Sequence, residues 1–131
     1  GLSRFRINLA RQMGNTSLVF RIIPYEIPTF EQLHLPPALN MFSKFHSGIV
    51  LVTGPTGSGK STTIASLIDL INKNERKHII TIEDPIEFIY SNKNCIITQR
   101  QVEIDTLSFP DGVKYALRQD PDVILIGEIL T

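Results

Sequence analysis

The stretch "GPTGSGKS", residues 54–61, fits the pattern G-x-x-x-x-G-K-[ST]. It follows the apolar run "GIVLVTG" (48–54) and leads into "KSTTIASLIDLIN" (60–72), where apolar residues recur at helical spacing. A strand, a glycine-rich turn and a helix, in this order, are the context that the pattern requires. Glycines let the backbone turn its N–H groups inward, and the helix start adds partial positive charge. The stretch therefore predicts a cradle for phosphate groups.

Each residue type in the cradle has a chemical role. We expect Lys60 to reach the β- and γ-phosphates of a nucleotide and Ser61 to offer its hydroxyl to Mg²⁺. An accidental Lys-Ser pair in a glycine-rich turn is the competing interpretation, and the flanking strand and helix patterns disfavour it. The expected nucleotide-binding residues are Gly54, Pro55, Thr56, Gly57, Ser58, Gly59, Lys60, Ser61 and Thr62.

Apolar strands alternate with helical patterns along the rest of the chain. This alternation predicts an α/β fold, a mostly parallel sheet with helices on both faces. The expected strands are "HIITIE" (78–83), "CIITQR" (95–100) and "DVILIGE" (122–128). The expected helices are 36–45, 60–72 and 108–119, the last capped by Ser108. Before them, 4–11 and 17–24 alternate like an antiparallel hairpin, and the prolines of 24–30 indicate a boundary.

The amino-acid composition disfavours some classes of function. Of 131 residues, 42% are hydrophobic and 20% charged, which is typical of a globular domain. Thirteen basic residues balance thirteen acidic ones, so a nucleic-acid partner is disfavoured. The apolar runs are too short for a membrane span. The single cysteine, Cys95, is expected to be a small buried residue, and the histidines lack metal-ligand spacing.

A second cluster of chemistry-bearing residues is "TIEDPIE" (81–87). Its three carboxylates, Glu83, Asp84 and Glu87, follow a predicted parallel strand, at the sheet edge where ligands bind in α/β folds. Like charges there repel one another unless a cation or hydrogen-bond donors intervene. A Mg²⁺ ion on a bound nucleotide would relieve this repulsion. The alternative is a solvated acidic loop that turns at Pro85.

With these two motifs the chain resembles the ATPases that power type IV pili and type II secretion, a branch of the RecA-like P-loop proteins. The resemblance continues through "FRIIP" (20–24), "TQRQVEIDTLSF" (98–109) and "YALRQDPDVILIGE" (115–128). The linker "IPTFEQLHLP" (27–36) is most similar to that of the PilT-type retraction ATPases. Departures are Gln101, where the family often has glutamate, and Leu130 and Thr131, where it has Arg-Asp.

The resemblance implies roles for further residues. Glu128 would position or deprotonate the attacking water, and Gly127 before it is the family's usual residue. Glu87 would act near the γ-phosphate and near Mg²⁺, through water, while Glu83 and Asp84 complete the acidic box. Arg6 and Arg21 on the hairpin would stabilise charge on the transferred phosphoryl group. Arg4 is a weaker candidate, and the alternative for all three is an exposed face with surface arginines.

The resemblance also implies an organisation. Residues 1–26 would end a small N-terminal α/β domain, 27–36 would be a linker, and 37–131 would be the first half of a RecA-like ATPase domain. The chain is expected to be a piece of a longer motor subunit of the type IV pilus, with ATP and Mg²⁺ as cofactors. The implied assembly is a hexameric ring, with the pilus platform protein as partner, at the cytoplasmic face of the inner membrane and without a span of its own.

Three other functions stay open at this stage. An export ATPase of a pilus or of type II secretion would use the same chemistry in the opposite mechanical direction. A truncated nucleotide-binding module would bind without turnover. A small-molecule kinase would need a lid over its acceptor, and no segment of the sequence has that character.

Overall fold

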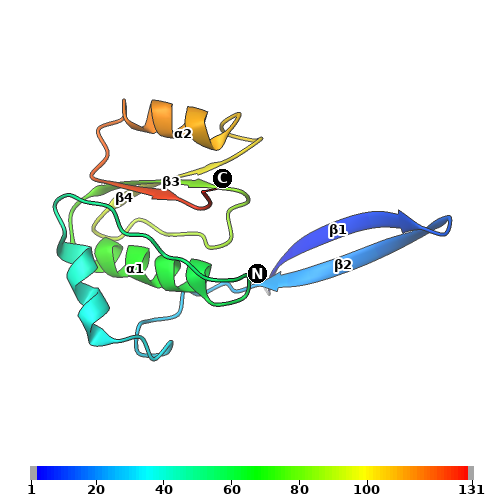
Figure 1. The fold of residues 1–131 in the computed structure, drawn as a ribbon, viewed down its shortest axis with the longest axis horizontal. Helices are drawn as coiled ribbons and strands as arrows, with labels where there is room; N and C mark the ends of the chain where they lie inside the picture. Colours follow the sequence, from blue (N-terminus) through cyan, green and yellow to red (C-terminus); the bar gives the residue numbers. More distant parts are fainter. Residues whose placement is uncertain (1–2, 130–131) are drawn as a thin grey trace.

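The computed structural model describes residues 3–129. It consists of a three-layer α/β core and a two-stranded hairpin that projects from it (Figure 1). The core strands are β3 (His78–Glu83), β4 (Ile96–Gln101) and β5 (Val123–Ile126). The helices are η1 (Pro37–Lys44), α1 (Lys60–Asn74) and α2 (Phe109–Ala116). The hairpin consists of β1 (Arg4–Gln12) and β2 (Asn15–Ile23).

The core sheet is parallel, in the order β4-β3-β5, with a helix on each face (Figure 1). Side chains of the central strand alternate between the two helices. Ile79 packs in one cluster with residues of α1, and Ile80 and Ile82 pack in another with Ala116 of α2. All three isoleucines are fully buried. The predicted fold class, a parallel sheet covered on both faces, is confirmed.

Ser108 caps the start of α2, as predicted. The Ser108 hydroxyl oxygen accepts a hydrogen bond from the backbone N–H of Asp111 at 3.2 Å and donates to the Asp111 carboxylate at 2.8 Å. The helix ends at Ala116, three residues before the predicted end, because the following residues form a tighter turn of the 3₁₀ type. Arg118 N–H and Gln119 N–H donate to carbonyls only three residues back.

The hairpin is long and apolar on one side. β1 and β2 pair along their whole length, and Met13 and Gly14 form the turn with positive φ values of 47° and 76°. Three apolar pairs lie directly opposite each other on one face, and each of these six side chains is at least half exposed: Phe5 and Ile22, Ile7 and Phe20, Leu9 and Leu18. A two-stranded ribbon of this kind is marginal by itself in water.

Two local predictions need correction. The apolar run 48–54 forms no strand, and Ile49 and Leu51 are 87% and 70% exposed. An apolar run becomes a strand only if a neighbouring strand supplies backbone partners, and no strand within residues 3–129 does so here. The helix expected at 36–45 forms as the 3₁₀-helix η1. Pro36 at its N-cap and Pro37 at its first position lack N–H donors, and the Ser43 hydroxyl donates to the carbonyl of Asn40 at 2.7 Å.

The segment 27–36, expected to be a linker, lies against α1. Phe30 is buried, and Ile27 packs against the hydrophobic cluster that contains the buried apolar residues of α1. The Ser66 hydroxyl of α1 donates to the carbonyl of Pro28. Thr29 N–H donates to the side-chain oxygen of Gln32 at 2.9 Å. These contacts give the segment a fixed course from the hairpin to η1.

Candidate nucleotide-binding site

The glycine-rich loop leads into α1 in a conformation that glycine permits. Gly54, Gly57 and Gly59 have φ values of 153°, 80° and 90°, and a Cβ atom at Gly54 would lie 2.8 Å from the Ser58 hydroxyl oxygen. The hydrogen-bond ladder of α1 begins at Thr63 N–H, which donates to Gly59 O at 2.9 Å. The N–H groups of residues 60–62 precede this ladder, so the helix itself does not use them. Such a helix start binds anions.

Lys60 lies across the loop that precedes it. Its ammonium group donates to the carbonyl oxygens of Gly54 and Pro55, at 2.8 and 2.9 Å. These contacts hold a positive charge beside the glycine-rich backbone. A phosphate group bound at the helix start would meet this charge together with the free backbone N–H groups.

Among the three carboxylates of the acidic box, Glu83 is the most enclosed. Its Oε2 atom accepts hydrogen bonds from the Thr81 hydroxyl at 2.6 Å and from the Gln99 amide at 3.2 Å. Burial raises the pKa of Glu83, and the charge of Glu87 adds to this, although the two hydrogen bonds act in the opposite direction. Asp84, next along the chain, is exposed.

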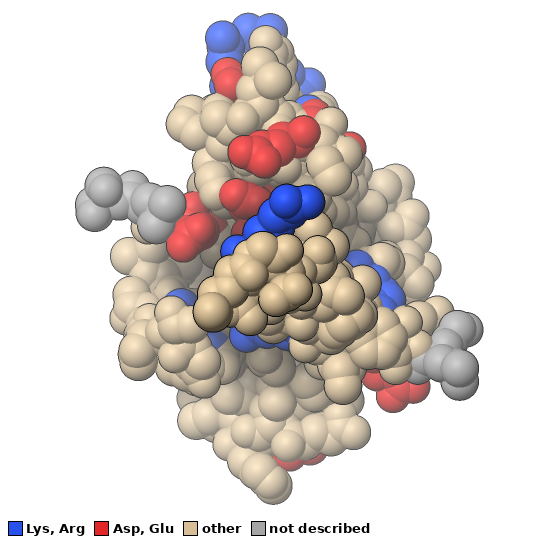
Figure 2. Space-filling view, turned by 90° about the vertical axis from the view of Figure 1, so that its right-hand side faces the viewer, with Lys and Arg blue, Asp and Glu red and all other residues tan. Residues whose placement is uncertain are grey.

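Glu87 faces the hairpin. Its carboxylate lies 3.7 Å from the Arg6 guanidinium, and its backbone carbonyl accepts a hydrogen bond from Arg4 at 3.1 Å. The Nε–H group of Arg6 is buried and has no hydrogen-bond partner within the described residues. The hairpin thus brings a cation with unused donor capacity to the acidic segment. Figure 2, which views the molecule from the hairpin side, shows both acidic and basic side chains around the outline of the hairpin.

A hollow of ≈ 160 Å³ lies where the hairpin, the acidic segment and the first turn of α1 meet. Its lining residues are Arg6, Arg21, Ile22, Ile23, Pro24, Thr62, Glu87 and Phe88. The structure therefore brings together four residues expected at the site, Arg6, Arg21, Thr62 and Glu87. Arg21 is the partner of Arg6 across the hairpin, so both guanidinium groups belong to its polar face.

Glu128 lies outside this hollow, two residues beyond the end of β5, the strand that pairs with β3. The Gly127 N–H donates to Ile82 O at 2.8 Å, so β5 stays bonded to β3 up to the residue before Glu128. A Cβ atom at Gly127 would lie 3.3 Å from Ile82 O and 3.5 Å from Glu83 Cγ. Glycine therefore fits where a larger residue would press on Glu83. Glu128 itself is exposed. The departures at Leu130 and Thr131 lie outside the described residues.

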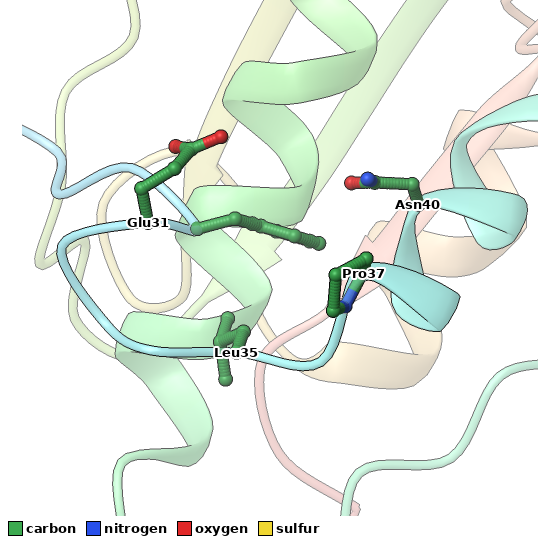
Figure 3. Close-up of a pocket in the computed structure, with 5 residues that line it drawn as sticks. Glu31, Leu35, Pro37 and Asn40 are labelled. Carbon is green, nitrogen blue, oxygen red and sulfur yellow. The ribbon is translucent and has the colours of Figure 1, made fainter.

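A second hollow, of ≈ 140 Å³, shares no lining residue with the first (Figure 3). Glu31 and Leu35 come from the segment before η1, and Pro37 and Asn40 come from its first turns. Phe30 completes the lining. None of the residues predicted at the site lines this hollow, so we do not associate it with the chemistry of the phosphate loop.

Two residues near the carboxylates were missed by sequence reasoning. Thr81 and Gln99 lie opposite each other in the β3–β4 register, and both hydrogen-bond to Glu83. Polar residues inside strands are common, and only the pairing of the two strands places these two beside a carboxylate. The sequence therefore carried no signal for them.

The described residues hold neither a metal cluster nor a membrane helix. Within 3–129 no group of three or more histidine, cysteine or acidic residues is arranged to hold a metal ion. None of the helices in this range has the length and apolar character that crossing a membrane requires. Cys95 is a buried free thiol, as predicted.

A parallel sheet between helices, with a glycine-rich phosphate loop opening α1, defines a P-loop α/β protein of the RecA-like ATPase fold. The family of type II/IV secretion system proteins matches residues 4–130. The type IV pilus retraction ATPase PilT of Pseudomonas aeruginosa is 48% identical over 98% of this chain. The type II secretion system protein E of Pectobacterium carotovorum is 51% identical over 63% of it.

Solved structures agree with these relatives. The crystal structure of the pilus retraction motor PilT with bound ADP superimposes with a TM-score of 0.95 at 51% identity, over 100% of this chain. That of the Legionella pneumophila ATPase DotB gives 0.85 at 31%, over 98%. The chain belongs to the type II/IV secretion system protein family. It spans 38% of the length of the P. aeruginosa relative and of the PilT structure, and 37% of the DotB structure.

Proposed function

We propose that this chain is the phosphate-binding part of an ATP-hydrolysing motor subunit that drives retraction of type IV pili. The observation that carries the proposal is the loop at the start of α1, with Lys60 held across its backbone and the first helical N–H groups outside the hydrogen-bond ladder. The similarity of almost the whole chain to a pilus retraction ATPase supports a role in pilus retraction.

Each of these residues has its own role in the proposed phosphoryl transfer. Residues 54–62 bind the phosphates, and Lys60 neutralises their charge. Arg6 and Arg21 supply guanidinium groups to the transferred phosphoryl group, and Glu128 orients the attacking water and accepts its proton. Glu87 keeps Arg6 at the hollow through its ion pair. Glu83 and Asp84 add negative potential beside it.

Mg²⁺ fits the donor set of this site. An exposed hydroxyl on Ser61 and the carboxylate of Glu87 are oxygen ligands that Mg²⁺ accepts directly or through water. When bound, the ion would neutralise charge on the β- and γ-phosphates.

At the scale of the whole protein, we propose a ring of identical subunits, a hexamer, at the cytoplasmic face of the inner membrane. In this assembly the partner would be the platform protein of the pilus. The proposed domain division places 1–26 at the end of an N-terminal domain, 27–36 between the domains and 37–131 in the ATPase domain.

The test of ATP use is Lys60→Ala in the full-length gene product. We expect nucleotide affinity to fall about tenfold or more, because charged hydrogen bonds of this kind contribute roughly 1.5–3 kcal/mol. Calorimetry with ADP and phosphate release from ATP measure binding and turnover. The matched control is Lys114→Ala, an exposed lysine on α2. Equal affinity of Lys60→Ala and wild type would contradict the phosphate-loop assignment.

A second candidate, an export ATPase, is favoured by the 51% identity to a type II secretion protein. Deletion of the gene separates the two. A cell without its retraction motor should keep surface pili and lose twitching motility, whereas a cell without its assembly motor should lose the pili. Loss of protein secretion with normal pili would indicate the type II system.

A further inference from the structure

Two glutamine side chains of β4 hold the backbone that follows β3. The Gln99 side-chain carbonyl accepts a hydrogen bond from Tyr90 N–H at 3.0 Å, and its amide donates to Phe88 O at 2.8 Å. The Gln101 side-chain carbonyl accepts from Ile86 N–H at 3.2 Å. Residues 86, 88 and 90 are therefore each bonded, at every second position, to side chains of a single strand.

Glu87 lies between the first two of these anchors, at residues 86 and 88. Phe88 and Tyr90 are buried, so the segment cannot rotate about its own axis without exposing them. A segment fixed in this way directs the intervening side chain away from its support. The Glu87 carboxylate lies on the hairpin side, 3.7 Å from Arg6, and its carbonyl accepts from Arg4.

The same glutamine also reaches the acidic box. Its amide donates to Glu83 Oε2 at 3.2 Å, in addition to Phe88 O. A glutamine amide has two N–H donors and one carbonyl, and all three groups of Gln99 are engaged. One side chain thus connects β4, the carboxylate at the end of β3 and the segment that carries Glu87.

We propose that Gln99 is a positioning residue for ATP hydrolysis, which acts by fixing the segment 86–90 so that Glu87 faces Arg6 in the hollow. The inference rests on the proposed function. It concerns the hydrolysis step rather than nucleotide binding, because Gln99 makes its contacts with the acidic segment and the phosphate loop belongs to α1.

The first experiment measures turnover and binding of Gln99→Ala in the full-length gene product. We expect kcat to fall about tenfold, while ADP affinity measured by calorimetry stays within about twofold of wild type. The matched control, Gln119→Ala, removes an exposed glutamine and should match wild type in both. Equal kcat for the two variants would overturn the inference.

A double-mutant cycle separates positioning from a general loss of stability. If Gln99 acts through Glu87, adding Gln99→Ala to Glu87→Gln should slow turnover no further than Glu87→Gln alone. Multiplied effects would overturn the inference. If thermal unfolding shows that Gln99→Ala does not fold, Gln101→Ala takes its place in the cycle, with an expected loss in kcat of about threefold. An unchanged kcat for that variant would also overturn it.

The same assay keeps this inference apart from the proposed function. A wild-type protein that shows no hydrolysis dependent on Lys60 would overturn both. A wild-type protein that hydrolyses ATP, with Gln99→Ala indistinguishable from Gln119→Ala, would overturn the positioning role alone.

Discussion

At the scale of single residues, Glu83 at the end of β3 and Glu128, two residues beyond the end of the neighbouring strand β5, lie in different surroundings. Glu83 is partly buried and hydrogen-bonded to Thr81 and Gln99, whereas Glu128 is exposed. A group that accepts a proton from water needs access to the reacting atoms. The exposed carboxylate is therefore the better candidate for catalysis, and the enclosed one is better suited to shaping the site.

Replacing Glu128 tests this division of roles. Glu128→Gln keeps the size of the side chain but removes the carboxylate that would accept a proton from water. In the full-length gene product we expect ADP affinity to be preserved and kcat to fall by more than about tenfold, which corresponds to about 1.4 kcal/mol of barrier. Phosphate release measures kcat, and Glu26→Gln, at an exposed carboxylate, is the control. A smaller loss would argue against a role for Glu128 in the chemical step.

The burial of Glu83 predicts a pH dependence of stability. Burial raises its pKa above the ordinary value of 4.5, so the folded protein holds the proton at pH values where the unfolded chain has released it. The carboxylate thus costs stability as the pH rises above about 4.5 and costs nothing well below that pH. Glu83→Gln should therefore increase the free energy of unfolding more at about pH 7 than at about pH 4.

Urea denaturation at the two pH values checks this expectation. Glu103→Gln, at an exposed carboxylate, serves as the control and should show the same small effect at both. A benefit of Glu83→Gln that is larger in acid would have the wrong sign and would contradict the assignment of a raised pKa.

The sequence could predict that a glycine-rich turn leads into α1, because such a turn depends on local backbone and a helix start. It could not predict that Gln99 and Thr81 surround Glu83. Those contacts depend on which residues of two strands lie opposite each other, and that register is set by packing between distant segments.

At the scale of the elements, the junction between β3 and β5 explains why glycine precedes Glu128. Gly127 N–H bonds to Ile82 O, and the space beside it is occupied by Glu83. An aspartate at this position would add a second carboxylate next to one that is already partly buried. The neighbouring strand therefore favours a residue without a bulky side chain at position 127.

Gly127→Asp should lower the free energy of unfolding by about 1–3 kcal/mol, through close contact and like-charge repulsion. Gly127→Ala should cost less, because a single methyl group needs the neighbouring atoms to move only slightly. Urea denaturation of the two variants at neutral pH measures the difference. Equal stability of the Asp and Ala variants would show that the proximity of Glu83 has no energetic consequence.

The elements also show where the spacing of apolar residues is enough to predict a helix or a strand. Strand β3 has the predicted bounds, and α1 and α2 begin within one residue of prediction. Each of these elements buries side chains against partners inside the described residues. The run 48–54 has an equally clear strand pattern and forms none. The spacing of apolar residues indicates which side of a segment can be buried. A strand also needs a neighbouring strand that supplies backbone hydrogen bonds.

At the scale of the whole molecule, the candidate site is shared between the core and the hairpin. Arg4 and Arg6 of β1 both contact Glu87, and the hollow has walls from the hairpin and from the first turn of α1. Chemistry at this junction depends on how firmly the hairpin is held. The six half-exposed apolar side chains on the other face of the hairpin would hold it firmly only if they were covered.

We predict that the isolated 131-residue chain binds nucleotide weakly and does not turn over ATP at a useful rate. Binding can persist because residues 54–61 form the cradle from local backbone, whereas phosphoryl transfer needs donors held in place around the γ-phosphate. The exposed run 48–54 and the apolar hairpin face also favour aggregation. Phosphate release and size-exclusion chromatography of the purified chain, with Lys60→Ala as control, test this expectation. Mg²⁺-dependent hydrolysis by a monodisperse sample, lost in Lys60→Ala, would show that these 131 residues are sufficient for catalysis.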